Sequence, residues 1–313
     1  MINAMWKDII GCESQIEELK GYIKTGKLPH AFLFAGMAGL GKTKTAREFF
    51  KAVNCSGSTG DGCDSCRTCL KVLNGSHPDL VSVSPSNGWI VVEDIRTMIS
   101  EVGLKPFEAR TRFIIIEPAE RMNKASSNAL LKTLEEPPDG SLIILISHKP
   151  ALLLPTIVSR CQIIRFAPLD ASAAEKSAID PVLLRLTSGT MGGLPSGDAE
   201  YLLEVREAVL DSIRDGDPAG LVNKYFSDAE QGPETLSVFL LVAESILRDL
   251  LVLSHGGGSI INEELREAVR RGIGSQGAEE IALCIRDIRR GVNENINQRV
   301  AMSDLLFRLK GIV

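Results

Sequence analysis

The residues best suited to chemistry lie in a glycine-rich run at positions 36–43, which reads GMAGLGKT. The run matches G-x-x-x-x-G-K-[ST] without a mismatch, between a short apolar stretch and a segment with helical spacing. In such a loop, backbone N–H groups and a helix N-terminus surround phosphates, the lysine reaches the β- and γ-phosphates, and the hydroxyl binds Mg²⁺. The alternative is a glycine turn that only opens a helix. The pattern predicts an ATP and Mg²⁺ site built from Gly36, Gly39, Leu40, Gly41, Lys42 and Thr43.

A second acidic group for this site is expected at the end of another strand. Residues 112–116 read RFIII, a short apolar run typical of a buried strand, and Glu117 follows directly. A carboxylate at a strand end can hold Mg²⁺, either directly or through water. The alternative is a strand that simply ends in a surface carboxylate.

Four of the seven cysteines fall within fifteen residues, separated by seven, two and two positions. A reducing compartment disfavours disulfides, and four thiolates with no vacant position are typical of a structural, tetrahedral zinc site with Zn–S near ~2.3 Å. Thiol exchange at the C-x-x-C steps is the main alternative. We expect Cys12, Cys161 and Cys284 to be small buried apolar residues. The predicted zinc ligands are Cys55, Cys63, Cys66 and Cys69.

The composition of the 313-residue chain narrows the class of protein. Hydrophobic residues make up 44%, charged residues 24%, and the net charge is -5. This balance excludes general nucleic-acid binding through bulk charge, so a DNA contact would need a local patch or a partner. The most apolar region, 236–254, is interrupted by Glu244, Arg248 and Asp249, which excludes a membrane span of about 20 apolar residues. The first residues lack the apolar stretch of a secretory signal, so we expect a cytoplasmic protein with no membrane partner.

Strand-like and helix-like runs alternate in the first half of the chain. We expect strands at 31–34, 112–116 and 142–146, and helices at 14–25, from 42 onwards and at 123–136. This alternation is typical of an α/β domain whose parallel sheet is covered on both faces. After about residue 168 the pattern is amphipathic helix, with one apolar face between 236 and 251. The expected domains are a nucleotide-binding domain at 1–167, a small helical domain at 168–205 and an all-α domain at 206–313.

Together these features resemble the clamp-loader ATPases of bacterial DNA polymerase III, the gamma/tau and delta-prime subunits, and most closely the delta-prime pattern. The resemblance covers most of residues 5–168 and is weaker beyond, where 297–309 is similar to the closing helix of the family's last domain. Besides the glycine-rich run and the cysteines, it depends on four segments. These are DIIG at 8–11, PHAFLF at 29–34, NALLKTLEEPP at 128–138 and LPTIVSRC at 154–161.

The resemblance implies a RecA-like AAA+ domain, a helical lid and a helical collar that assembles a five-subunit ring. Its partners would be the gamma/tau and delta subunits, with the sliding clamp and primed DNA reached through the complex. Arg160, in the S-R-C motif at 159–161, would act in trans as a catalytic residue on the ATP of a neighbouring subunit. The alternative for Arg160 is a surface ion pair. Ser147 would lie near the sensor position, and His148 beside it is expected to be a solvated surface histidine.

Two departures from the family pattern bear on catalysis. Active members carry D-E-A-D or similar after the apolar strand, but residues 117–120 read EPAE, which places Pro118 where the water-activating glutamate should stand. Losing a general base typically costs about 10²–10⁴-fold in rate. Gly192 also replaces a phosphate-sensing arginine. We therefore expect a ring component of the polymerase III holoenzyme with weak or absent ATP hydrolysis.

Two other functions remain as alternatives. A hydrolysing motor subunit would need Glu117 or Glu120 as its base. A metabolite kinase can use the same phosphate loop, but that function explains neither the S-R-C motif nor the helical C-terminal part.

Overall fold

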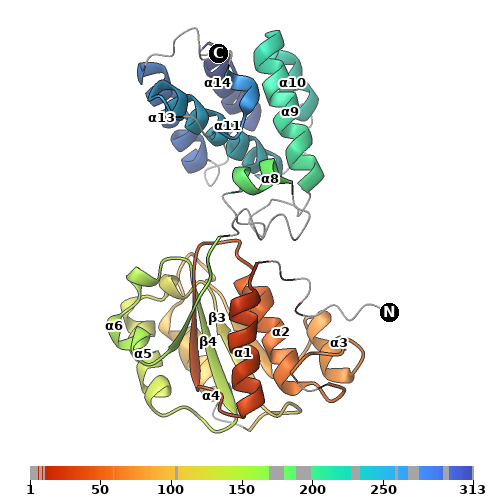
Figure 1. The fold of residues 1–313 in the computed structure, drawn as a ribbon. Coiled ribbons are helices and arrows are strands. Elements are labelled where there is room, and N and C mark those ends of the chain that lie inside the picture. Colours follow the sequence, from red (N-terminus) through yellow and green to blue (C-terminus); the bar gives the residue numbers. More distant parts are fainter. Residues whose placement is uncertain are drawn as a thin grey trace. The chain divides into compact units, whose positions relative to one another are not determined.

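A parallel sheet forms the centre of the first of two units into which the chain divides, Met1–Ala173 and Ala174–Val313 (Figure 1). The computed structural model describes residues 6, 9, 11–58, 60–102, 105–168, 180–187, 199–226, 233–257, 260–266, 275–291 and 296–311.

The sheet has five strands among the described residues, in the order β2-β3-β4-β1-β5, and every neighbouring pair is parallel. The strands β1, β3 and β4 agree with the runs expected from the sequence. Strands β2 and β5 were not predicted, because both lie at sheet edges and are only partly buried, so that neither forms a continuous apolar run. The bounds are β1 Ala31–Ala35, β2 Leu80–Val83, β3 Arg112–Ile116, β4 Ser141–Ser147 and β5 Gln162–Arg165.

Both faces of the sheet are covered, as the alternating pattern predicts. Phe32 and Phe34 of β1 pack into one hydrophobic cluster with residues of α1 and α2, whereas Leu33 packs into a second cluster with residues of α4 and α5. The helices of this unit are α1 Glu13–Thr25, α2 Lys42–Asn54, α3 Arg67–Leu73, α4 Val92–Val102, α5 Lys124–Glu135 and α6 Pro155–Val158. Two short 3-10 helices are η1 Ala119–Arg121 and η2 Pro150–Leu152.

Aromatic side chains hold helix α2 on the sheet. Phe49 and Phe50 are fully buried, and both rings contact Phe113 of β3 edge-on, with centroid distances of 5.3 and 5.2 Å. Phe49 also contacts Phe32 of β1 at 5.6 Å. Edge-to-face pairs of this kind add about 0.5–1.5 kcal/mol each beyond the area they bury. Helix α2, which carries Lys42 at its start and leads into Cys55 at its end, is therefore a fixed element.

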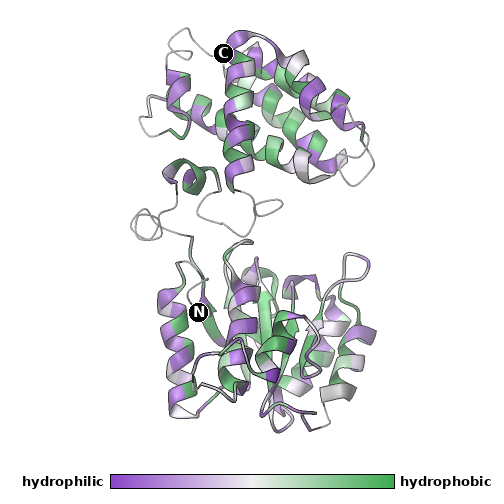
Figure 2. Ribbon diagram, turned by 90° about the vertical axis from the view of Figure 1, so that its right-hand side faces the viewer, coloured by the Kyte–Doolittle hydropathy of each residue, from purple (hydrophilic) through white to green (hydrophobic). Residues whose placement is uncertain are grey.

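The described residues of the second unit are helical and contain no strand. Helix α11 is the central element and packs against α8, α9, α13 and α14 around one hydrophobic cluster. Figure 2 shows apolar and polar residues on different sides of these helices. The bounds are α8 Pro181–Leu186, α9 Ala199–Asp215, α10 Pro218–Phe226, α11 Pro233–Ser254, η5 Glu263–Leu265, α13 Ser275–Gly291 and α14 Gln298–Lys310.

The apolar face expected between 236 and 251 is buried over most of its length. Leu251 is an exception, since it is 39% exposed. Within this unit, Leu183 and Leu202 belong to the same hydrophobic cluster as the residues of α11. The separation of a lid at 168–205 from a collar at 206–313 stays a prediction. Across the described parts of both units, no helix has the length and apolar character that crossing a membrane requires.

Candidate nucleotide and metal sites

The glycine-rich run forms the turn between β1 and α2. Gly36 follows β1 directly, and a Cβ atom there would lie 2.4 Å from the backbone oxygen of Phe166, so only glycine fits this approach. Gly41 precedes α2 with φ at +73°, a left-handed conformation that glycine adopts without a steric penalty. Strand, turn and helix thus follow in the order that a phosphate-binding loop requires.

The ammonium group of Lys42 lies inside this turn. The residue is only 3% exposed, and its Nζ donates hydrogen bonds to the carbonyl of Gly36, at 2.6 Å, and to that of Met37. Burial lowers the pKa of Lys42, while the nearby carboxylates of Glu117 and Glu120 oppose that shift. The lysine is therefore placed where the curled loop surrounds it.

The structure brings Thr43 and Glu117 together although 74 positions separate them in the sequence. The Thr43 hydroxyl lies 2.8 and 2.6 Å from the two carboxylate oxygens of Glu117. Thr43 stands in the first turn of α2, and Glu117 follows the last residue of β3. A hydroxyl and a carboxylate at this spacing supply the oxygen ligands that Mg²⁺ prefers beside a phosphate-binding loop.

The other groups near the expected catalytic positions have backbone partners. The Glu120 carboxylate accepts a hydrogen bond from the backbone N–H of His148, at 3.2 and 3.3 Å to its two oxygens. Ser147 is fully buried, and its hydroxyl accepts from the N–H of Lys149. His148, expected to be a solvated surface residue, is half-buried: its Nδ1 is shielded from solvent and has no hydrogen-bond partner among the described residues. Gly192 lies outside the described residues.

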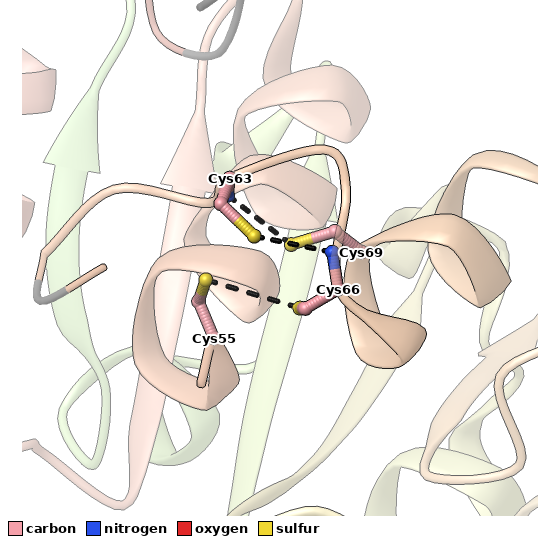
Figure 3. A group of neighbouring side chains, drawn as sticks. All are labelled: Cys55, Cys63, Cys66 and Cys69. Carbon is pink, nitrogen blue, oxygen red and sulfur yellow. Dashed lines mark hydrogen bonds between the residues drawn. The ribbon is translucent and has the colours of Figure 1, made fainter. Parts of the chain in front are cut away.

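The four clustered cysteines converge at the far end of helix α2 (Figure 3). Cys55 follows the last residue of α2, Cys66 caps α3, Cys69 lies in the first turn of α3, and Cys63 comes from the loop between the helices. Their Sγ atoms all lie within 4.8 Å of one another, and those of Cys55 and Cys66 are 3.9 Å apart. Four sulfurs around one zinc at ~2.3 Å would stand roughly 3.8 Å apart. The cluster can therefore hold a metal ion.

Backbone donors in this cluster point at sulfur. The N–H of Gly57 donates to Cys55, that of Cys66 to Cys63, and that of Cys63 to Cys69, at 3.2–3.4 Å. Hydrogen bonds from Ser65 lower the pKa of Cys63 to about 6, which favours its thiolate, whereas burial raises the pKa of Cys55 and that of Cys69.

The three remaining cysteines differ in burial. Cys12 is buried, as expected, and burial raises its pKa to about 11. Cys161 and Cys284 are only half-buried, and the Cys284 thiol lies 3.5 Å from a carboxylate oxygen of Asp304.

Arg160 follows α6, and its hydrogen-bond and ion-pair partners are residues outside the phosphate-binding turn. Its guanidinium donates to the carbonyl of Thr156 at 2.8 Å and forms an ion pair with Glu135, the last residue of α5. The side chain is 34% exposed. Arg160 is thus a partly exposed residue with an ion-pair partner, which agrees with the alternative of a surface ion pair.

A family model described as DNA polymerase III, delta subunit, matches residues 11–170, slightly more than half of the chain. The delta-prime subunit of Bacillus subtilis is 26% identical over 327 aligned positions, which cover 97% of this chain and 98% of that protein. The delta-prime subunit of Pseudomonas aeruginosa is 37% identical over 148 positions, 46% of this chain and 45% of that protein. The chain belongs to the DNA polymerase III clamp-loader subunit family.

Other members of the family match over shorter parts. The tau subunit of Escherichia coli is 30% identical over 69% of this chain but only 37% of its own length. This chain therefore spans most of a delta-prime relative and less than half of the tau relative. A gamma subunit-related protein of DNA polymerase III from Thermotoga maritima has the same fold, with a TM-score of 0.51, 18% identity, and coverage of 95% of this chain and 99% of that one.

Sequence reasoning missed two charged residues beside the cysteine cluster, Lys51 and Asp64. In sequence, Lys51 is a lysine in a helix and Asp64 a loop acid, and both residue types are usually solvated. The one available signal was the place of Asp64 within the C-x-x-C step. The structure buries Lys51 against it, at 2.7 Å.

Proposed function

We propose that this chain is the delta-prime subunit of a bacterial clamp loader, a ring component that helps to load the sliding clamp onto primed DNA. The observation that carries the proposal is an assembled phosphate-binding loop beside Pro118. Lys42, Thr43 and Glu117 are positioned for nucleotide and Mg²⁺, yet a proline stands where an active member carries its water-activating glutamate. The match along 98% of a delta-prime relative favours this subunit over gamma/tau.

Binding of ATP with Mg²⁺ follows from the chemistry of the loop. Backbone N–H groups at Gly39, Leu40 and Gly41 surround the phosphates, Lys42 reaches the β- and γ-phosphates, and Thr43 with Glu117 holds the metal ion. Hydrolysis is weak or absent, because Pro118 has no titratable group.

The four cysteines bind one structural zinc ion. Thiolates are soft ligands that favour zinc over magnesium or calcium, and a closed set of four protein ligands leaves no open position for chemistry. The ion stabilises the fold of residues 55–69, and no step of nucleotide chemistry involves it.

Arg160 acts on the nucleotide of a neighbouring subunit. Its side chain is partly exposed, as that of a residue that reaches across a subunit boundary must be. The partners are the gamma/tau and delta subunits in a five-subunit ring in the cytoplasm, and the net charge of -5 is consistent with reaching DNA through the complex.

Reconstitution tests the proposal. The chain is mixed with the gamma/tau and delta subunits of the same organism, and the complex is examined by size-exclusion chromatography with light scattering and by clamp loading on primed DNA. We expect a stoichiometric complex whose loading activity depends on this chain. A chain that neither joins the complex nor affects loading would overturn the assignment.

A hydrolysing motor subunit is the second candidate, since Glu120 is a carboxylate close enough to act on the charge of Lys42. Steady ATP turnover by the isolated chain, lost in Lys42→Ala, would favour this candidate. Turnover that is absent, or unchanged in Lys42→Ala, supports the weakly hydrolysing subunit.

A further inference from the structure

Lys51 is an unusual lysine, because its side chain is only 1% exposed on the last turn of helix α2. Its ammonium lies 2.7 Å from a carboxylate oxygen of Glu48, one turn earlier, and 2.7 Å from one of Asp64. Lysine is almost never fully buried unless it is paired. The two carboxylates compensate the buried charge, and one of them comes from outside the helix.

Asp64 is the outside partner, and its backbone conformation is as unusual as the burial of Lys51. Among the described residues it is the one non-glycine position with a positive φ, at +47°. Left-handed backbone costs roughly 1–2 kcal/mol for an ordinary L-residue, and glycine adopts it at no such cost. Aspartate is one of the few other residues that adopt this conformation, because its short side chain can hydrogen-bond locally, and here that side chain is paired with Lys51.

The turn that Asp64 makes sets the direction of two cysteines. It lies between Cys63 and Cys66, the members of the first C-x-x-C step, where the Cys66 N–H donates to the Cys63 sulfur at 3.2 Å. The opposing ligand, Cys55, directly follows α2, and Lys51 accepts its backbone N–H on its own carbonyl at 2.8 Å. Lys51 thus bonds to Cys55 through its backbone carbonyl, and through its ammonium to Asp64, which lies between Cys63 and Cys66.

We propose that Lys51 is a positioning residue for the four-cysteine metal site: its buried ammonium holds Asp64 in the left-handed turn that points Cys63 and Cys66 at Cys55 and Cys69. The inference rests on the proposed metal site. Partners that orient metal ligands without touching the ion typically contribute 10–100-fold to metal affinity.

The test is the rate at which the purified full chain transfers zinc to a chromogenic chelator. We compare wild type with Lys51→Met, Asp64→Asn and Asp64→Gly. Asparagine tolerates the left-handed region as aspartate does, and glycine adopts it without a steric penalty, so both variants remove the ion pair without adding backbone strain. We expect all three to release zinc roughly 10–100-fold faster than wild type. The absorption of the cobalt-substituted chain reports whether the tetrahedral thiolate geometry is disturbed.

Asp61→Asn is the matched control, because Asp61 lies in the same loop and makes an exposed ion pair with Lys20 at 2.9 Å. It should release zinc at the wild-type rate. The triple variant Glu48→Gln/Lys51→Met/Asp64→Asn removes all three charges of the cluster, and so separates positioning from the penalty of an unpaired buried charge. If Lys51 and Asp64 position the cysteines, this variant should release zinc as fast as the single variants do, even if its melting temperature returns towards that of wild type.

Two outcomes would overturn the inference, and they are distinguishable. Wild-type zinc retention in Asp64→Gly, or in the triple variant, would show that the turn alone places the cysteines. A wild-type chain that binds no zinc at all would overturn the proposed metal site together with the role of Lys51.

Discussion

The hydroxyl of Thr43 contacts both carboxylate oxygens of Glu117, at 2.8 and 2.6 Å, and so joins the start of helix α2 to the end of strand β3. Sheet topology explains the contact. The strands that precede these residues, β1 and β3, are parallel to β4 between them, so their carboxyl ends meet at one edge of the sheet. Ligands of open α/β sheets bind at this edge.

The first prediction follows from this contact. Glu117→Gln should weaken the binding of MgATP by roughly 10–100-fold, because a charged ligand group typically contributes about 1.5–3 kcal/mol. The binding of ATP without Mg²⁺ should change much less, since Lys42 and the loop backbone remain. Titration calorimetry with and without Mg²⁺ measures both constants.

Glu136→Gln is the control for this experiment, because Glu136 is an exposed carboxylate beyond α5. If Glu117→Gln weakens the binding of ATP equally with and without Mg²⁺, the carboxylate supports the loop and does not bind the metal ion.

The core of the sheet could be predicted from the sequence, and its edges could not. Strands β1, β3 and β4 are continuous apolar runs because both faces are buried, and such runs are visible in one sequence. In β5, Gln162 and Arg165 interrupt the pattern, because an edge strand exposes polar side chains. Leu251 lies on the predicted apolar face of α11 and is nevertheless exposed. Helical spacing predicts which side of a helix is apolar, but it does not predict where the helices that cover this side end.

The candidate site divides in the same way. Motifs of fixed spacing placed Lys42 and Thr43 at a strand–helix turn and brought four cysteines together. Contacts between segments that are distant in the sequence have no fixed spacing, so a single sequence does not predict them. His148 is half-buried, with its Nδ1 shielded from solvent, because packing between distant segments surrounds it, and such packing leaves no pattern near residue 148.

Metal removal provides the second prediction. Protein prepared without added zinc should contain about one zinc per chain, and a strong chelator should lower the melting temperature, because the free energy of metal binding is folding free energy for residues that the ion organises. Atomic emission and differential scanning calorimetry measure the two effects. A disulfide within the cluster, with no metal bound, would contradict the zinc assignment and favour thiol exchange.

The third prediction concerns Asp79, a fully buried carboxylate that fixes the segment before β3. Burial alone would raise its pKa, but hydrogen bonds from the backbone of Glu108, Phe107 and Ala109 and from Arg112 outweigh it and lower the pKa to about 2. An unfolded aspartate titrates near ~3.9. The stabilisation is therefore complete above about pH 4 and is lost as the pH falls towards about 2, with a total of roughly 2–3 kcal/mol.

Asp79→Asn should consequently reduce the free energy of unfolding at pH 7 by roughly 3–5 kcal/mol, because it removes the buried charge that pairs with Arg112. Urea denaturation at pH 7 and at pH 3 measures the difference between variant and wild type, which should be smaller at the lower pH. Asp139→Asn, at an exposed position, should change little at either pH. A difference that is the same at both pH values would show that the charge of Asp79 is not what stabilises the segment.

The last prediction is that Arg160 acts in trans. Its ion pair with Glu135 is partly exposed, and exposed pairs contribute about 0–1 kcal/mol, so Arg160→Ala should fold and assemble with its partners. Arginine fingers contribute about 10³–10⁵-fold to hydrolysis in P-loop enzymes. ATP turnover at the adjoining subunit, stimulated by DNA and clamp, should therefore fall sharply, and clamp loading with it. Arg160→Lys should restore little, because an ammonium lacks the planar fork that matches phosphate oxygens.

Arg214→Ala is the matched control for that experiment, since Arg214 is an exposed arginine paired with Asp211 in the second unit. It should assemble, hydrolyse ATP and load clamps as wild type does. Because Arg160→Ala removes the guanidinium without touching the phosphate loop of its own chain, nucleotide binding by the isolated chain should be unchanged. A reconstituted Arg160→Ala ring with wild-type turnover would mean that Arg160 contributes only its surface ion pair with Glu135.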